Sequence, residues 1–313
     1  MKAVRIHNFG GPEVVQVEDV PTPDPKPDEL RVRVCAASIN PVDHKTWEGK
    51  YPSVPRDALP ITLGRDISGI VEHCGSEVWA FETGDTVYAM LSPEQGGFAE
   101  YVVLKEEQVA AKPIHLSHAE AAAVPLAALT AWQGLFEHGG LRAGERVLIH
   151  GGAGGVGHFA IQFAKVAGAT VLTTVGTKDC AFARELGADE AIDYKTQRFE
   201  ELARDIDLVF DLIGGETQAR SWSVLRKGGT IVSTLGQPAQ EKARSYGVRA
   251  IGYQARPNAE QLTEIADLID ARRVHPVVTA TYPFMSIVEA EKSQETNHLR
   301  GKVVLQLAAL SSA

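Results

Sequence analysis

The stretch HGGAGGVGHF, from His150 to Phe159, has five glycines among its ten residues, and the rest of the chain is interpreted outward from it. Its residues Gly152, Gly154 and Gly157 fit the pattern Gly-x-Gly-x-x-Gly. The preceding residues, 146–149, have the character of a short apolar strand, and apolar residues recur at helical spacing after the glycines. This context favours a dinucleotide cradle over a glycine-rich turn without a ligand.

Each glycine of this cradle has a physical role. The first permits a tight turn, the second lets the backbone approach a pyrophosphate, and the third lets the helix pack closely on the strand. The helix that follows offers unpaired N–H groups and a favourable dipole to an anion. The predicted cofactor-binding residues of the loop are Gly152, Gly154, Gly155, Val156 and Gly157.

The end of the next predicted strand, Thr170 to Val175, bears on the choice of dinucleotide. An NAD site usually carries an acidic residue there that bonds the ribose 2′-hydroxyl, and this chain has Gly176 instead. The missing carboxylate removes repulsion against a 2′-phosphate, which Lys178 is close enough in sequence to pair with. NADPH is therefore the predicted cofactor, held at this end by Gly176, Thr177, Lys178 and Tyr194. The alternatives are a solvated Lys178 at a helix start and a Tyr194 that merely caps the third strand.

Strands and helices alternate around the glycine stretch, which predicts a parallel sheet with crossover helices. The predicted elements of this region are strands at 170–175, 207–210, 230–233 and 248–252 and helices at 156–167 and 178–186. The first hundred-odd residues are β-rich instead, and Ser117, with Glu120 three residues later, marks a helix start between the two regions. Further elements are predicted as strands at 30–34, 67–72, 85–90 and 301–307 and helices at 260–272 and 285–295.

Composition narrows the class of protein. The chain has 313 residues and a net charge of −9, so it lacks the basic excess that binding nucleic acid requires. It shows no apolar run long enough to span a bilayer, and its first ten residues lack a signal-peptide core. Three scattered cysteines fit a reducing cytoplasm, and neither a CxxC pair nor an HExxH motif suggests a local zinc site. We therefore expect a cytoplasmic protein that acts on a small molecule.

Motifs along nearly the whole chain resemble the zinc-free quinone oxidoreductase and enone reductase branch of the medium-chain dehydrogenase/reductase superfamily. Their order along the chain also matches that branch. The motifs are NPVDHK at 40–45, GRDISG at 64–69, GDTVY at 84–88, GGFAEY at 96–101, ALTAW at 128–132, GGAGGVG at 151–157, LGAD at 186–189 and GKVV at 301–304.

The resemblance implies a fold and an assembly. A doubly wound Rossmann domain that binds NADP(H) is expected at residues 120–253. A discontinuous GroES-like β-rich catalytic domain is expected at residues 1–119 and 254–313. Members of the superfamily often dimerise through the last Rossmann strand, which here is the segment 248–252. A homodimer is therefore the expected assembly.

The resemblance also implies chemistry without a metal. Zinc alcohol dehydrogenases have a cysteine ligand where this chain has Asn40, and Gly-His-Glu where it has Gly64-Arg65-Asp66. They often carry a four-cysteine lobe that is missing here. Without those ligands no Lewis acid polarises an alcohol, whereas conjugate reduction of a quinone or an α,β-unsaturated carbonyl remains accessible. Arg65 and Asp66 are expected to form a structural pair in the space of the missing zinc.

By resemblance, the catalytic residues are Asn40, Asp43, Lys45 and Tyr51, with the Tyr51 hydroxyl bonding a carbonyl or relaying a proton. The alternatives from the residues alone are a surface Asp43–Lys45 ion pair and a turn residue at Asn40. The resemblance adds four residues to the predicted cofactor site: Thr130, Leu235, Gly236 and Lys302. Thr130 has an alternative as a helix-interior hydroxyl bonded to its own backbone. Some quinone oxidoreductases have a phosphate-binding lysine where this chain has Cys180.

Three functional hypotheses follow. The first is an NADPH-dependent, zinc-independent reductase of quinones or α,β-unsaturated carbonyl compounds. The second is an NADPH-binding regulatory or structural protein with little turnover. The third is an alcohol dehydrogenase that uses NAD and zinc, which the residues at positions 40 and 65 disfavour.

Overall fold

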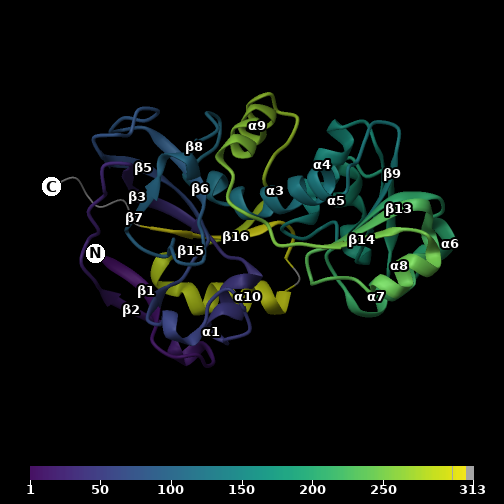
Figure 1. Ribbon diagram of the computed structural model, residues 1–313, viewed down its shortest axis with the longest axis horizontal. Helices are drawn as coiled ribbons and strands as arrows, with labels where there is room; N and C mark the ends of the chain where they lie inside the picture. The colour runs from purple at the N-terminus through teal and green to yellow at the C-terminus, as the bar shows by residue number, and fades with distance from the viewer. Residues whose placement is uncertain (298, 308–313) are drawn as a thin grey trace. The chain divides into compact units, whose positions relative to one another are not determined.

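The computed structural model describes residues 1–297 and 299–307, and the chain forms two compact units (Figure 1). The β-rich unit comprises Met1–Leu126, Arg256–Ala271 and the chain from Pro276 onward, and the parallel-sheet unit comprises Ala127–Ala255 and Arg272–His275. Among the helices that the structure describes, none combines the length and the apolar character needed to cross a membrane.

The boundaries of the units differ from the predicted 119/120 and 253/254 for local reasons. Helix α2 (His118–Ala122) packs on strands of the β-rich unit, so the first boundary falls at Leu126/Ala127. Residues 272–275 return to the parallel-sheet unit because His275 and Gln162 exchange two hydrogen bonds of 2.9 and 3.0 Å. The β-rich unit is discontinuous along the chain.

The β-rich unit contains two sheets. The first has the order β2-β1-β4, and the second is seven-stranded with the order β15-β16-β3-β5-β6-β8 and β7 also paired to β3. The strands are β1 (Lys2–Ile6), β2 (Gln16–Asp19), β3 (Glu29–Ser38), β4 (Ile61–Thr62), β5 (Asp66–Cys74), β6 (Thr86–Met90), β7 (Tyr101–Lys105), β8 (Ala110–Ala111), β15 (Val278–Pro283) and β16 (Lys302–Gln306). The unit's helices besides α2 are α1 (Pro41–Trp47), α9 (Ala259–Asp270) and α10 (Ile287–Asn297).

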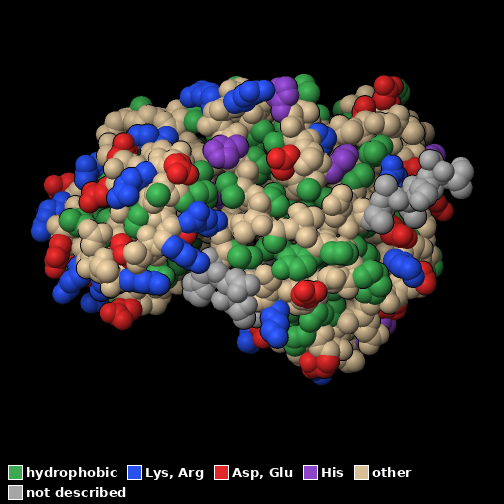
Figure 2. All heavy atoms as spheres, turned by 180° about the vertical axis from the view of Figure 1, so that it is seen from behind, with side chains coloured by type: hydrophobic (Ala, Val, Ile, Leu, Met, Phe, Trp, Pro, Cys, Tyr) green, Lys and Arg blue, Asp and Glu red, His purple; other side chains and the backbone are tan. Residues whose placement is uncertain are grey.

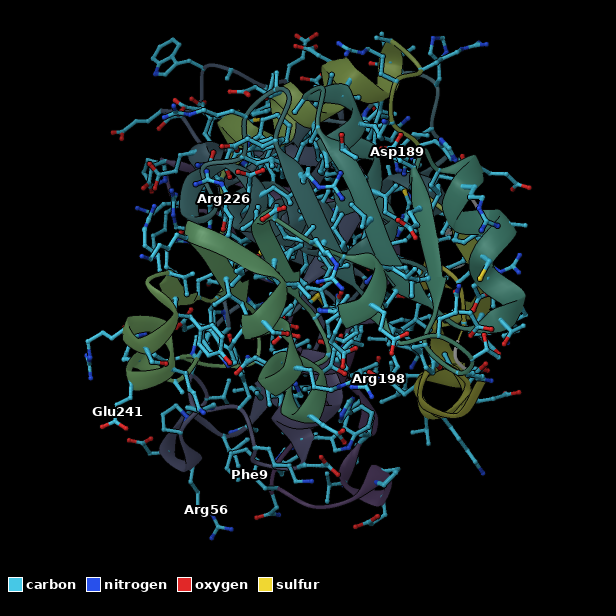
Figure 3. All side chains as sticks on the ribbon, turned by 90° about the vertical axis from the view of Figure 1, so that its right-hand side faces the viewer. Phe9, Arg56, Asp189, Arg198, Arg226 and Glu241 are labelled. Atoms are coloured by element: carbon cyan, nitrogen blue, oxygen red, sulfur yellow. The ribbon has the colours of Figure 1, made fainter. Side chains whose placement is uncertain are left out.

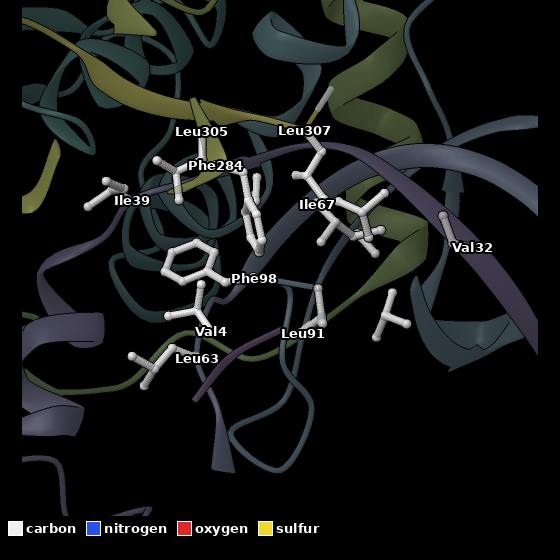
Figure 4. Close-up of a cluster of buried hydrophobic side chains, with 14 of the residues drawn as sticks. Val4, Val32, Ile39, Leu63, Ile67, Leu91, Phe98, Phe284, Leu305 and Leu307 are labelled. Atoms are coloured by element: carbon white, nitrogen blue, oxygen red, sulfur yellow. The ribbon is translucent and has the colours of Figure 1, made fainter. Parts of the chain in front are cut away.

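The core of the β-rich unit joins the two ends of the chain (Figure 4). Strand β3 alternates buried and half-buried residues, so one of its faces is apolar. Phe98 and Ile67 are completely buried, and Phe284 and Leu305 from the far end of the sequence belong to the same cluster. Burial of this shared apolar surface holds strand β16 beside β3, and β16 begins at Lys302.

The parallel-sheet unit is built on one six-stranded sheet with the order β11-β10-β9-β12-β13-β14. All its neighbouring strands pair in parallel, so the predicted doubly wound sheet is confirmed. Helices α4 and α5 lie on one face, and α6, α7 and α8 lie on the other (Figure 1). The strands are β9 (Arg146–His150), β10 (Thr170–Val175), β11 (Glu190–Asp193), β12 (Ile206–Asp211), β13 (Leu225–Ser233) and β14 (Arg249–Gly252). The helices are α3 (Pro125–Trp132), which begins in the other unit, a π-helix at Gln133–His138, α4 (Gly157–Val166), α5 (Cys180–Glu185), α6 (Phe199–Leu202), α7 (Gly215–Ser221) and α8 (Gln240–Tyr246).

Candidate functional site

The most tightly connected polar group of the β-rich unit centres on Asp66, which is completely buried. Its carboxylate accepts hydrogen bonds from the Ser38 hydroxyl at 2.7 Å, the Asn40 amide at 2.8 Å and the Leu126 backbone N–H at 2.7 Å. The Lys302 ammonium lies 3.8 Å from the same carboxylate and donates to the side-chain oxygen of Asn40. Every one of these groups is satisfied, as burial of charge requires.

Local structure explains why Asn40 and Asp43 meet this network. Asn40 follows β3 and is the N-cap of α1, whose first residue is Pro41. The Asp43 carboxylate accepts the Asn40 backbone N–H at 2.8 Å, which satisfies a helix-start donor. Asp43 is only 2% exposed, so it is a buried carboxyl rather than one member of a surface ion pair. The alternative of a surface Asp43–Lys45 pair is therefore wrong.

Burial sets the protonation of these groups. Burial raises the pKa of Asp43 to about 7, and the nearby Asp66 charge adds to the increase, while the Asn40 N–H and the Arg65 and Lys302 charges oppose it. Burial also lowers the pKa of Lys302, against the opposing attraction of Asp66 and Asp43. Asp43 can therefore exchange a proton near neutral pH.

Arg65 does not pair with Asp66, so the expected Arg65–Asp66 pair is wrong. Arg65 Nε donates to the Leu91 carbonyl at 2.7 Å, and Nη1 donates to the Tyr51 hydroxyl oxygen at 3.3 Å. Asp66 takes Lys302 as its cation instead, because β16 delivers that lysine to the end of β3. No sequence-local signal links positions 66 and 302.

The remaining predicted residues of this unit lie at different depths. Lys45 is half-buried and pairs with no carboxylate among the residues that the structure describes. Lys302 was predicted to bind the cofactor. In the structure its ammonium donates hydrogen bonds to the Ile39 carbonyl and the Asn40 side chain and forms an ion pair with Asp66. Its part in cofactor binding stays a prediction. Asn40, Asp43, Asp66, Arg65 and Tyr51 form one connected neighbourhood.

In the parallel-sheet unit, the glycine loop joins β9 to α4 as predicted. A Cβ on Gly152 would overlap the Thr173 hydroxyl, and one on Gly157 would overlap the Gly151 carbonyl, so strand, loop and helix pack as closely as the sequence pattern implied. A Cβ on Gly154 would have one neighbour, at 3.4 Å. The N–H groups of residues 155, 156 and 157 find no acceptor within the described parts of the chain. This loop fits a pyrophosphate.

The predicted 2′-phosphate end lies where β10 and β11 finish. A Cβ on Gly176 would stand 3.6 Å from both the Tyr194 hydroxyl and the Asp179 carboxylate, so Gly176 and Tyr194 lie close together. Tyr194 is 54% exposed. The Thr177 hydroxyl bonds Asp193, which together with the bonds from Lys195 and Thr196 holds the pKa of that carboxyl below its ordinary value. Sequence reasoning missed Asp179, which brings a carboxylate close to the predicted phosphate end.

Other residues beside the loop were partly predicted. Leu235 is 49% exposed and covers Gly214, and Gly236 has a φ of +111°, which suits glycine. Ile213 was missed, although it is 55% exposed and lies 3.1 Å from the position of a Cβ on Gly151. The sequence feature that could have indicated Ile213 is its position shortly after a predicted buried strand. The carbonyl of Thr130, which is buried, accepts the Tyr253 hydroxyl.

His150 is a further residue that the sequence analysis did not assign. It is completely buried, with Nδ1 3.0 Å from the Thr174 hydroxyl and Nε2 2.9 Å from the Ser221 hydroxyl. Burial lowers its pKa to about 4, so the ring is neutral at pH 7. Neutral His150 connects the strand that enters the glycine loop to β10 and α7.

The fold and the two polar sites define a dinucleotide-binding protein with a separate β-rich unit, and comparisons with known proteins agree. Residues 26–114 match the family model described as alcohol dehydrogenase GroES-like domain, and residues 186–305 match the one described as zinc-binding dehydrogenase. The chain is 37% identical to the mouse mitochondrial NAD(P)H oxidoreductase RTN4IP1, over 90% of this chain and 82% of the relative. It is also 37% identical to an Arabidopsis thaliana chloroplastic NADPH-dependent alkenal/one oxidoreductase, over 97% of this chain and 79% of the relative.

A solved structure extends the likeness to the fold. The quinone oxidoreductase from Coxiella burnetii has a TM-score of 0.91 and 36% identity, over 98% of this chain and 99% of that one. The chain belongs to the medium-chain dehydrogenase/reductase superfamily, in its quinone oxidoreductase and enone reductase branch. The fold expected from the sequence is therefore confirmed.

Proposed function

We propose that this protein is an NADPH-dependent reductase of quinones or α,β-unsaturated carbonyl compounds. The observation that carries the proposal is the glycine loop, whose three unpaired N–H groups face no protein acceptor within the described residues. Relatives named for NADPH-dependent alkenal/one reduction and for quinone reduction support the reaction class.

The chain's own residues have distinct roles in this proposal. When bound, the nicotinamide supplies a hydride to the acceptor. The loop at 152–157 holds the pyrophosphate. Gly176 leaves room for a 2′-phosphate, and Lys178 and Tyr194 bond that phosphate. Reduction of a conjugated carbonyl places negative charge on oxygen, which hydrogen-bond donors stabilise best in a water-poor site. Tyr51 is the donor of the β-rich unit that we assign to that oxygen or to the proton that follows.

We further propose that the reaction needs no zinc. The positions that hold zinc in alcohol dehydrogenases have here an amide at Asn40 and a guanidinium at Arg65, and neither is a zinc ligand of the usual kind. The neighbouring Asp66 carboxylate is already used by Ser38, Asn40 and Lys302. Within the described parts of the chain, no three His, Cys, Asp or Glu side chains stand close enough to hold a metal ion.

A cytoplasmic location and a homodimer complete the proposal. Strand β14 is the edge of its sheet and pairs only with β13 among the described strands, so its free edge suits pairing with a second copy. On the face drawn in Figure 2, acidic and basic side chains are interspersed, which fits the absence of a nucleic-acid partner. Light scattering of the purified protein measures the assembly directly.

The deciding experiment measures the dissociation constants of NADPH and NADH side by side by calorimetry, and then screens acceptors with the preferred cofactor. We expect tighter NADPH binding and faster NADPH oxidation with an enone or a quinone. Binding of NADPH without turnover across a broad acceptor panel would favour a regulatory or structural protein. One equivalent of zinc per chain, with NAD-dependent alcohol oxidation, would favour an alcohol dehydrogenase.

A further inference from the structure

Arg65 is a buried charged group of the β-rich site to which the proposed function gives no catalytic role. It is only 7% exposed. Its backbone carbonyl accepts the Leu91 N–H at 2.7 Å, and its Nε donates to the Leu91 carbonyl at 2.7 Å, so this residue is fixed at two points. A guanidinium held in this way has a defined orientation because its donors form a rigid plane.

The free edge of that guanidinium meets Tyr51. Nη1 lies 3.3 Å from the Tyr51 hydroxyl oxygen, and Cζ lies 6.0 Å from the centre of the tyrosine ring. An arginine side chain has donors only, so the Tyr51 oxygen must accept in this bond and its hydrogen must point elsewhere. Within the described residues no protein group accepts that hydrogen, and Tyr51 is only half-buried. The hydroxyl proton is therefore available to a bound molecule.

We infer that Arg65 is a positioning residue that aims the Tyr51 hydroxyl as the proton donor for an α,β-unsaturated carbonyl acceptor. This inference rests on the proposed function. With hydride delivered to the β-carbon, as a bound nicotinamide would allow, the acceptor would be an enolate that still needs a proton at its α-carbon. The α-carbon takes the Tyr51 proton: a C–H bond forms, the O–H bond breaks, and its electron pair stays on the Tyr51 oxygen. The Arg65 N–H stabilises that phenolate until water returns the proton.

Quinones provide an internal control for this role. Their reduction places electrons on ring oxygens, which take protons directly from water, so no proton has to reach carbon. Loss of the Arg65–Tyr51 contact should therefore slow enone reduction much more than quinone reduction. A merely structural Arg65 would affect both acceptors alike.

The test compares five proteins: wild type, Tyr51→Phe, Arg65→Met, Arg65→Lys and the control Arg56→Met. Arg56 is exposed, and its side chain points away from the chain in Figure 3. Each protein is assayed with NADPH and either an α-methyl enone or a benzoquinone. The readouts are kcat/KM, the configuration at the new α-carbon by chiral chromatography, the NADPH dissociation constant and Tm.

We expect Tyr51→Phe and Arg65→Met to lower enone kcat/KM by about a hundredfold and to scramble the α-carbon, with a loss on the quinone that is at least about tenfold smaller. Arg65→Lys keeps the charge without the planar fork and should lose roughly tenfold on the enone. It replaces Arg65→Met if that variant does not fold. Parallel losses on both acceptors with retained configuration, or no loss, would overturn the inference. A wild type that reduces neither acceptor would overturn the proposed function itself.

Discussion

The candidate sites of the two units are built from different kinds of polar group. In the β-rich unit Asp43, Asp66 and Lys302 share one hydrogen-bonded network, and Arg65 bonds Tyr51 beside it. The parallel-sheet unit presents backbone N–H groups at the glycine loop and supports them with the neutral ring of His150. Buried charges are sensitive to loss of a partner, whereas a backbone site is sensitive to added atoms. Substitutions can test this difference.

The largest effect is expected at Lys302. Lys302→Met leaves the Asp66 carboxylate buried without its cation, and we expect the free energy of unfolding to fall by about 3–5 kcal/mol. Urea denaturation measures the loss. Asp66→Asn combined with Lys302→Met should recover much of it because no charge then remains unpaired. As a control, Lys165→Met breaks the exposed Lys165–Asp189 pair (Asp189 is labelled in Figure 3) and should cost at most about 1 kcal/mol.

The next effect concerns pH. The unfolded chain protonates His150 near its ordinary pKa of 6.5, whereas the folded ring stays neutral down to about pH 4. Its contribution of up to about 3 kcal/mol is therefore complete above pH 6.5 and is lost as the pH falls toward 4. His150→Gln should flatten this fall in urea denaturation between pH 7 and 4.5. An unchanged slope would contradict a buried neutral His150.

Asp43 should show the opposite sign. Its folded pKa of about 7 lies above the ordinary 3.8, so the folded protein binds the extra proton and stability falls as the pH rises from about 4 to 7. Asp43→Asn should remove that fall while keeping an acceptor for the Asn40 N–H. If His150→Gln and Asp43→Asn changed the slope of unfolding free energy against pH in the same direction, the expected difference between the two sites would be wrong.

The glycine loop should respond to a single added methyl group. Gly157→Ala places a Cβ on the Gly151 carbonyl oxygen, and we expect the NADPH dissociation constant to rise at least about a hundredfold, or about 2.7 kcal/mol. Gly176→Ala, at the proposed phosphate end, is the comparison variant, and we expect a smaller loss because its Cβ meets only ordinary contacts of 3.6 Å or more. Calorimetry measures the NADPH dissociation constant of both variants. An equal increase in the two variants would contradict the expectation that close packing makes the loop sensitive to an added Cβ.

The smallest effect should be a change of cofactor preference. Gly176→Asp places a carboxylate at the strand end, where it repels a 2′-phosphate and can bond a ribose hydroxyl. We expect the NADPH-to-NADH affinity ratio to fall by roughly tenfold, which corresponds to about 1.4 kcal/mol. Asp179 already lies beside this position, and Asp179→Asn should shift the ratio the other way. Fluorescence titration with both cofactors measures the ratio.

Much of the parallel-sheet unit was predictable because its signals are local. The strand at 170–175 was predicted to the residue. In the β-rich unit a local signal of the same kind predicted the helix start at Ser117, which has the expected capping box. The glycine spacing identified the loop because it lies between a strand and a helix, and Gly157 meets the carbonyl of Gly151 only six residues earlier. Ile213 and His150 escaped because a residue at a strand end shows its partners only after the sheet forms.

The β-rich site was predictable only as a set of residue types. The sequence by itself determined that Asn40, Asp43, Tyr51 and Arg65 occur in a family pattern and that a cation stands at position 302. Only the tertiary structure decided that Lys302, not Arg65, neutralises Asp66, and that Arg65 turns to Tyr51 instead. The physical reason is the distance along the chain over which each interaction acts. Helix caps and glycine turns act over a few residues, whereas a buried ion pair forms between whichever charges the folded sheet brings together.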